Sequence, residues 1–252
     1  MSIPDSVYAQ AGYRCRLDWG WRGARQAAAR GDIVVIVDVL RFSSAVAMAA
    51  QHGVIVYPCE MQGDVEARSR EVGGVAGGRS LDDTARFSLS PRTFEGAEPG
   101  TRVVLASLNG AMCSINARGA PHAFAASLLN ASAVAAHVVS LLDADPSLDV
   151  TVVACGERWR DANEDGELRF AVEDYLGAGA VLSELSHERS PETAVCAAAF
   201  AGSRGDIAAL LWECASGREL RSMGLEQDVI DCARIDVYDA VPVLRDGAYA
   251  RL

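Results

Sequence analysis

The chain has 252 residues, half of them hydrophobic, and a formal net charge of −11 at pH 7. This length and apolar content can supply the core of one domain or two. The negative charge argues against nucleic acid or an anionic membrane as a partner, because no basic run offsets it locally. We expect a cytoplasmic protein, since we identify neither a secretory signal nor an apolar run of the roughly 18 residues that cross a bilayer.

Short β-branched runs alternate with alanine-rich stretches, which is the pattern of a parallel or mixed sheet covered by helices on both faces. The predicted fold class is therefore α/β. Each predicted strand is an unbroken apolar run, as expected of strands buried on both sides. The predicted strands are Ile33–Val37, Val54–Pro58, Arg102–Ala106, Ala123–Ala126 and Val150–Ala154. The predicted helices are Ser44–His52, Asp64–Glu71, Ala111–Arg118, Ala131–Asp143, Arg169–Leu185 and Thr193–Ser216.

The organisation of the chain indicates one domain over residues 1–252. Val72–Pro99 is rich in Gly, Ser and Pro and reads as a long connection within that domain. Ala240–Leu252 carries Asp-Gly between two extended pieces, which predicts a hairpin, and we expect it to close an edge of the sheet. Recurring strand–loop–helix units leave open a structural duplication, with two similar halves meeting near residues 100–125.

The first loop that carries candidate chemistry follows the strand Ile33–Val37. Asp38 ends that strand, Arg41 follows, and Ser43 and Ser44 can cap the next helix. In open α/β sheets ligands bind at the carboxyl ends of strands, where a carboxylate can hold Mg²⁺ while a guanidinium and a helix N-terminus neutralise phosphate oxygens. The structural alternative is an Asp–Arg pair that ties the loop together, with Ser43 as a plain cap.

The second loop runs from the strand Arg102–Ala106 into Asn109 and Gly110 before a helix. Asn109 can ligate an ion or donate to an oxyanion. The alternative is an Asn-Gly turn with Asn109 in a left-handed conformation.

The third loop follows the strand Val150–Ala154 with Cys155-Gly156-Glu157 and leads to a helix that bears Glu173 and Asp174. Adjacent residues point about 100° apart on a helix, so only one of the two carboxylates can face a shared site squarely. The pair fits one metal ligand plus one supporting or capping group. The alternative is a solvated acidic helix face.

Several familiar phosphatase and nucleotide-binding signatures are absent from the sequence. No cysteine is followed by arginine at the sixth position, which excludes the cysteine-phosphatase mechanism, and no Asp-x-Asp directly follows a strand. A Walker loop, a dinucleotide-binding glycine fingerprint and a nucleophile elbow are also missing. The seven cysteines are scattered without a Cys-x-x-Cys pair, which argues against a disulfide framework and a zinc site.

Taken together, the three loops resemble the 2-phosphosulfolactate phosphatase (ComB) family. The resembling pieces are VVIVDVLRFSSAVA, VAGGR with a later FSLSP, SLNG, VVACGE followed by RFAVEDYLGAG, and DVIDCARIDVYDAVPVL. The resemblance implies a three-layer α/β/α fold and a Mg²⁺-dependent acid phosphatase that hydrolyses 2-phosphosulfolactate, or a related small phosphorylated acid, in coenzyme M biosynthesis. It implies a small anionic substrate and leaves a homodimer open.

The site residues that the resemblance implies fall into three groups. The catalytic candidates are Asp38, Arg41 and Asn109. The substrate-binding candidates are Ser43, Ser44, Arg79 and Gly110. The metal candidates are Asp38, Glu173 and Asp174.

One departure from the family pattern concerns Gly78, which stands where the family usually has glutamate. Loss of a carboxylate would weaken or retune the binding of a cation. The alternative function is therefore a catalytically silent anion-binding protein that keeps the pocket without the metal. A nucleotide-dependent transferase ranks third, because the phosphate-binding glycine fingerprints are missing.

Overall fold

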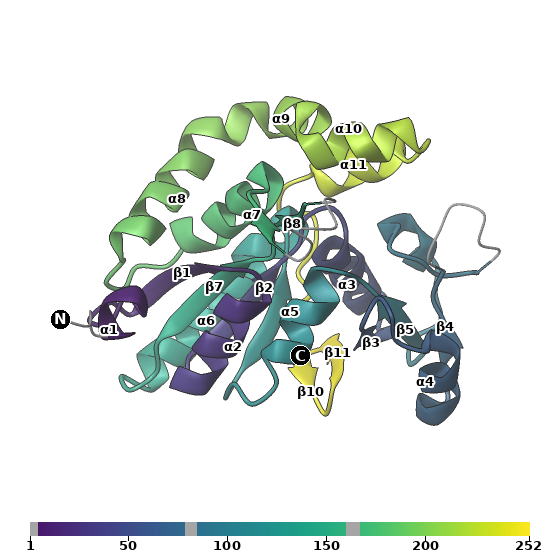
Figure 1. Ribbon diagram of the computed structural model, residues 1–252, viewed down its shortest axis with the longest axis horizontal. Helices are drawn as coiled ribbons and strands as arrows, with labels where there is room; N and C mark the ends of the chain where they lie inside the picture. Colours follow the sequence, from purple (N-terminus) through teal and green to yellow (C-terminus); the bar gives the residue numbers. More distant parts are fainter. Residues whose placement is uncertain (1–4, 79–84, 160–166) are drawn as a thin grey trace.

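The computed structural model describes residues 5–78, 85–159 and 167–252. Nine strands of the described chain form one mixed sheet in the order β1-β7-β2-β6-β10-β11-β3-β5-β4, and β8 pairs with β9 in a separate ribbon (Figure 1). The strands are β1 Cys15–Trp19, β2 Ile33–Val37, β3 Ile55–Cys59, β4 Val75–Ala76, β5 Arg102–Ala106, β6 Ala123–Ala126, β7 Val150–Ala154, β8 Glu157–Arg158, β9 Leu168–Arg169, β10 Pro242–Arg245 and β11 Ala248–Arg251. The α/β prediction with a mixed sheet is confirmed.

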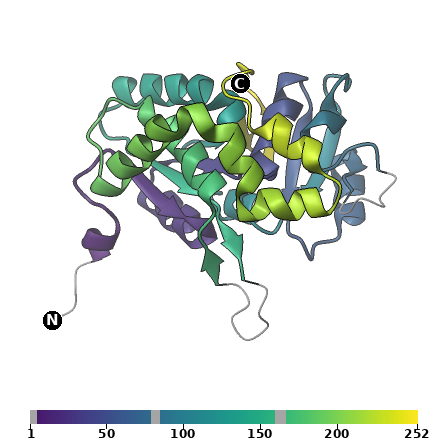
Figure 2. The ribbon, with the colours of Figure 1, turned by 90° about the horizontal axis from the view of Figure 1, so that it is seen from above.

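Helices cover both faces of this sheet, as the view from above shows (Figure 2). The α-helices are α1 Asp5–Tyr8, α2 Gly20–Arg30, α3 Phe42–Gln51, α4 Val65–Val72, α5 Gly110–Asn116, α6 Ala131–Ala144, α7 Val172–Ser183, α8 Pro191–Ser203, α9 Ile207–Glu213, α10 Ala215–Ser222 and α11 Glu226–Cys232. Three 3-10 helices are η1 Pro91–Phe94, η2 Leu128–Asn130 and η3 Arg204–Asp206.

Strand β2 shows why an unbroken apolar run is needed at the centre of the sheet. Val34 and Ile36 pack in the cluster that includes α2 and α5, whereas Val35 and Val37 pack with α6 and α7 on the opposite face. Because successive side chains of a strand point to opposite faces, both alternating sets must be apolar when helices cover both faces.

The C-terminal hairpin corrects one prediction. It forms as expected around Asp246-Gly247, but it lies inside the sheet and not at its edge. Val243 of β10 pairs antiparallel with Phe124 of β6, and Tyr249 of β11 pairs antiparallel with Val56 of β3. The hairpin therefore joins two groups of parallel strands, and its buried tyrosine is part of the core.

The predicted helix Thr193–Ser216 is also corrected, because the segment is divided into α8, η3, α9 and the start of α10. The break falls at Arg204-Gly205-Asp206, where a 3-10 turn interrupts the α-helical ladder. By length and composition alone the helical stretch Pro191–Glu213 can cross a membrane, with a mean hydropathy of 1.4. The sequence analysis predicted a helix over most of this stretch but did not identify it as long and apolar enough to cross a bilayer.

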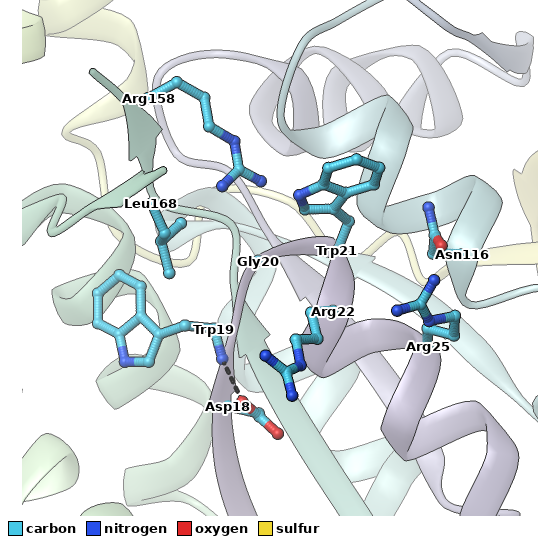
Figure 3. Close-up of a pocket in the computed structure, with 9 residues that line it drawn as sticks. All are labelled: Asp18, Trp19, Gly20, Trp21, Arg22, Arg25, Asn116, Arg158 and Leu168. Atoms are coloured by element: carbon cyan, nitrogen blue, oxygen red, sulfur yellow. Dashed lines mark hydrogen bonds between the residues drawn. The ribbon is translucent and has the colours of Figure 1, made fainter. Parts of the chain in front are cut away.

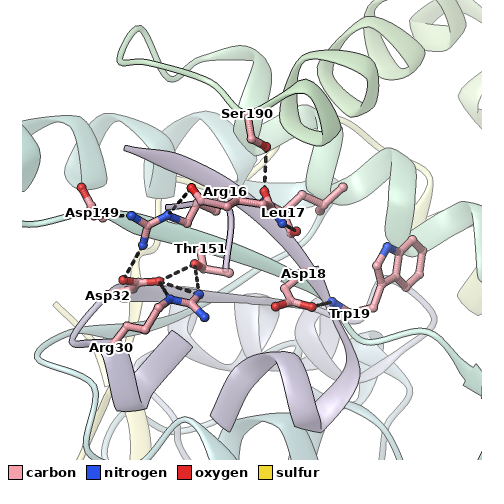
Figure 4. Close-up of polar contacts among 10 residues, drawn as sticks. Arg16, Leu17, Asp18, Trp19, Arg30, Asp32, Asp149, Thr151 and Ser190 are labelled. Atoms are coloured by element: carbon pink, nitrogen blue, oxygen red, sulfur yellow. Dashed lines mark hydrogen bonds and ion pairs between the residues drawn. The ribbon is translucent and has the colours of Figure 1, made fainter. Parts of the chain in front are cut away.

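Strand β1, which sequence analysis missed, is held at its amino end by a buried ion-pair network (Figure 4). Arg16 of β1 reaches Asp32 at 2.9 Å and Asp149 at 2.5 Å, just before β2 and β7 respectively. Arg30 and Thr151 complete the coordination of Asp32, at 2.8 Å and 2.6 Å. Arg16 interrupts the apolar pattern by which strands were predicted, and the same side chain fixes β1 in the sheet.

Candidate functional site

Asp38 lies at the carboxyl end of β2 and is held by backbone groups from two different loops. One carboxylate oxygen accepts a hydrogen bond from the Phe42 N–H at 3.1 Å, and the other accepts from the Gly110 N–H at 2.8 Å. These donors are in the first turns of α3 and α5, whose N-termini stabilise negative charge. The side chain is therefore fixed where two helix N-termini meet.

Ser43 and Ser44 lie inside the first turn of α3, so the prediction that they cap it is wrong. The Ser43 hydroxyl accepts from the Asp38 N–H and donates to the Ile36 carbonyl, both at 3.0 Å. The Ser44 hydroxyl donates to the Val39 carbonyl at 2.7 Å. Both side chains are fully buried and hold the loop that presents Asp38; their role as substrate ligands stays a prediction.

Asn109 immediately precedes α5, and its backbone is not left-handed, with φ −107° and ψ −70°. The alternative of a left-handed Asn-Gly turn is therefore wrong. Its side-chain nitrogen donates to the Glu157 carboxylate at 3.0 Å. Its buried side-chain oxygen has no hydrogen-bond partner among the described residues, which leaves an acceptor available to a ligand.

Gly110 is placed where no larger residue fits. A Cβ atom at this position would lie 2.5 Å from the Phe42 ring and 2.6 Å from a carboxylate oxygen of Asp38. The absence of a side chain allows the backbone N–H to reach that oxygen. Gly110 thus contributes through its amide, and a role toward the substrate itself remains a prediction.

Glu173 and Asp174 are both buried in the first turn of α7, so the alternative of a solvated acidic face is wrong. Asp174 accepts from the Val39 N–H and the Gly156 N–H, each at 2.8 Å, and so ties the loop after β2 to the loop after β7. Both oxygens of Asp174 are engaged in holding loops. Glu173 is the member of the pair without such backbone bonds among the described residues.

Glu157 and Asp228 are two site residues that sequence reasoning did not single out. Glu157 begins β8 directly after the β7 loop and contacts Asn109. Asp228, buried in α11, pairs with Arg41 at 2.5 Å and accepts a hydrogen bond from the Ser90 hydroxyl. Arg41 therefore forms its ion pair with Asp228 of α11. Among the described residues it forms none with Asp38, the pair that the structural alternative had expected. The position of Glu157 next to a buried strand was the available signal.

The carboxylates of the site repel one another. Burial raises the pKa of Asp38 to about 6, with Glu173 adding to the effect against the hydrogen bonds from Phe42 and Gly110. Burial also raises the pKa of Glu157 to about 7, with Asp38 and Glu173 contributing. Burial and the same two carboxyl groups raise the pKa of Asp174 well above its usual range. Raised pKa values in one cluster are typical of a functional site.

Gly78 and Arg79 belong to the remaining family piece, VAGGR. Gly78 is buried, and its N–H donates to the Phe87 carbonyl at 2.7 Å. Arg79, a predicted substrate ligand, lies outside the described residues.

The carboxylate and amide oxygens of the site are the kind of ligands that a hard divalent cation prefers. Within the described ranges no three His, Cys, Asp or Glu side chains are grouped to hold an ion by themselves. Mg²⁺, however, usually binds one or two carboxylates and completes its coordination with water and substrate phosphate. Asp38 and Glu173 are neighbouring anionic groups, and the unpartnered oxygen of Asn109 is a further hard donor. These residues fit Mg²⁺ as a site that the substrate completes.

Fold and site together define an α/β protein with an acidic, amide-bearing site at the carboxyl ends of its strands, the place where this class binds phosphorylated ligands. A family model described as 2-phosphosulpholactate phosphatase matches residues 23–247, and the chain belongs to that family.

Individual relatives agree with the family match. A probable 2-phosphosulfolactate phosphatase of Gloeobacter violaceus is 28% identical over 222 residues, covering 84% of this chain and 87% of that protein. A protein of the same description from Thermus thermophilus is 30% identical over 222 residues, covering 85% and 88%. A third, from Carboxydothermus hydrogenoformans, is 28% identical over 216 residues, covering 83% and 84%.

Proposed function

We propose that this protein is a Mg²⁺-dependent phosphoric monoester hydrolase that acts on 2-phosphosulfolactate or a related small phosphorylated acid. The observation that carries the proposal is Asp38, fixed by the Phe42 and Gly110 N–H groups at the meeting point of two helix N-termini. Family membership supports the reaction type, and the relatives' names support the substrate.

In this proposal Asp38, Glu173 and the Asn109 side-chain oxygen hold the cation, which would supply neutralising charge at the phosphate when bound. Asp174 positions the loops by its bonds to Val39 and Gly156. Arg41, braced by Asp228, supplies positive charge beside Asp38, whose pKa it lowers.

Glu157 is proposed to be the general acid that protonates the leaving group. In the metal-free protein, burial, with Asp38 and Glu173 adding to the effect, raises its pKa to about 7, so a protonated Glu157 can donate to the leaving alkoxide oxygen when the P–O bond breaks. Asn109 orients it through the 3.0 Å hydrogen bond to the carboxylate. The attacking group is either water or Asp38 itself. Trapping of a phosphoenzyme in a rapid-quench experiment with labelled substrate decides between the two, and its absence eliminates the covalent route.

The direct test is phosphate release from a panel of phosphorylated and sulfonated three-carbon acids, with and without Mg²⁺. We expect release from 2-phosphosulfolactate that requires the metal and is lost in the Asp38→Asn variant. Release that persists after chelation would contradict the Mg²⁺ requirement. No release from any member of the panel would contradict the hydrolase.

The second candidate is a silent anion-binding protein, which Gly78 favours because the family resemblance implies a glutamate at that position. This candidate predicts a higher melting temperature with phosphorylated or sulfonated acids but no turnover. We also propose a cytoplasmic location. A homodimer remains a prediction, which sedimentation of the purified chain can test.

A further inference from the structure

A hollow of about 550 Å³ beside the site is lined by arginines and tryptophans (Figure 3). Arg22 and Arg25 enter it from α2, and Arg158 enters it from β8. In a chain of net charge −11, three guanidinium groups at one hollow form a concentrated positive region. Asp18 is the acidic residue in its lining, so the described lining is positive overall.

The position of Arg22 is unfavourable for the helix that carries it. It lies in the first turn of α2, where the helix dipole disfavours cations, and this turn contains no acidic residue. Trp19, the N-cap residue, makes no side-chain capping hydrogen bond. Among the described residues, Arg22 and Arg25 form no salt bridge with a carboxylate. Both side chains are exposed, and Arg22 adds positive charge to the first turn of a helix that has no capping side chain, with Arg25 one turn further on.

Of two consecutive residues, Glu157 contacts the Asp38 site through Asn109 and Arg158 lines the hollow. Glu157 and Arg158 are consecutive in β8, so their side chains face opposite sides of the strand. Glu157 contacts Asn109, and Arg158 lies over the Trp21 ring at 5.5 Å from its centroid. Trp21 and Arg158 also line a second hollow of about 310 Å³, which Leu108 borders next to Asn109.

We propose that Arg22, Arg25 and Arg158 form a subsite for a second acidic group of the substrate, a carboxylate or sulfonate remote from the phosphate that is cleaved. This inference rests on the proposed hydrolase and deepens it. Planar guanidinium groups bind carboxylate and sulfonate oxygens through paired charge-assisted hydrogen bonds. The subsite would select acids with a further negative group over simple phosphate esters.

The test compares two three-carbon esters in the Arg22→Ala/Arg25→Ala double variant. 2-Phosphosulfolactate has additional carboxylate and sulfonate groups, and glycerol 2-phosphate has only neutral hydroxyls. We expect the KM for the first to rise about tenfold or more, with kcat/KM for the second changed by less than about twofold. The matched control is Arg68→Ala/Arg218→Ala, which removes the same charge from exposed pairs with Glu71 and Glu213 and should change neither value.

An equal loss for both esters, or no loss for either, would overturn the subsite while leaving the hydrolase intact. If the wild type cleaves neither ester, the proposed hydrolase function is contradicted. The subsite is then tested separately by measuring the affinity for sulfolactate by calorimetry. Binding that weakens about tenfold in the double variant but not in the control supports it. The calorimetry is repeated with inorganic phosphate, which has no remote carboxylate or sulfonate. If the double variant binds phosphate more weakly to the same extent, the arginines do not recognise the remote acidic group.

Discussion

Buried carboxylates occupy both ends of the same parallel strands, but their partners differ. At the amino ends, Asp32 is paired with Arg16 and Arg30 and also accepts from Thr151 (Figure 4). At the carboxyl ends, Asp38 accepts only backbone N–H groups among its described hydrogen bonds, and burial, with Glu173 adding to the effect, raises its pKa.

The difference separates a structural network from the candidate functional site. Where each buried carboxylate has a guanidinium, the charges are balanced within the fold and nothing further is needed. Where carboxylates face one another and are held by uncharged donors, negative charge is left over for a cation or a proton to neutralise. Burial alone does not distinguish the two ends. The identity of the partners does.

The largest expected effect is on activity at the carboxyl end. Asp38→Asn removes the central negative charge, so phosphate release should fall by about a thousandfold or more. The variant should remain folded by circular dichroism, because relief of repulsion among the carboxylates offsets the hydrogen bond that the amide no longer accepts. Turnover near the wild-type rate would place Asp38 among the structural residues and remove the contrast between the two ends.

At the amino end the same substitution should affect stability instead. Asp32→Asn leaves Arg16 and Arg30 without their shared carboxylate, which should lower the free energy of unfolding by about 3 kcal/mol. Denaturant titration measures this loss. The remaining folded fraction should keep its kcat, since the network lies at the opposite ends of the strands from Asp38. A large loss of kcat with unchanged stability would reverse the assignment.

Gly110→Ala should disturb both properties. The new methyl group would clash with Phe42 and with Asp38, so we expect a stability loss of about 1 to 3 kcal/mol and slower turnover. Gly205→Ala is the control, because a Cβ there meets nothing within 4 Å. Melting curves and phosphate release should separate the two variants, and a Gly110→Ala protein as stable and active as the control would show that the close approach is not required.

The pH dependence of stability should be the smallest effect. The pKa values of Asp38 and Glu157 rise on folding, from 3.8 to about 6 and from 4.5 to about 7. The folded state therefore holds more protons in this range, and metal-free protein should lose stability as pH rises from about 4 to 7. In Glu157→Gln the decline should be smaller by about 1 to 2 kcal/mol.

Chemical unfolding at pH 5 and pH 8 measures both declines. Mg²⁺ should recover stability at pH 8 in the wild type, and less in Asp38→Asn, because it neutralises the same carboxylates. An identical decline in wild type and Glu157→Gln would show that Glu157 titrates alike in the folded and unfolded states.

The sequence by itself determined the local elements and the chemistry of the loops. Four predicted strands have the bounds found in the structure, because strands buried on both faces are mostly apolar runs. Asp38, Asn109 and the Glu173-Asp174 pair were identified because polar residues directly after such strands or in the following helix turns are the usual ligands of this sheet architecture. The hairpin was likewise visible in its Asp-Gly turn.

Only the tertiary structure decided which partners these residues have. Hydrogen-bond and charge partners come from segments far apart in the chain, as with Arg41 and Asp228 or Asn109 and Glu157. The division between Asp174, which holds two loops, and Glu173, which has no such backbone bonds among the described residues, depends on two backbone N–H groups from other loops. The hairpin lies inside the sheet because β10 pairs with β6 and β11 pairs with β3, and the periodicity within a segment does not show which distant strands it will pair with.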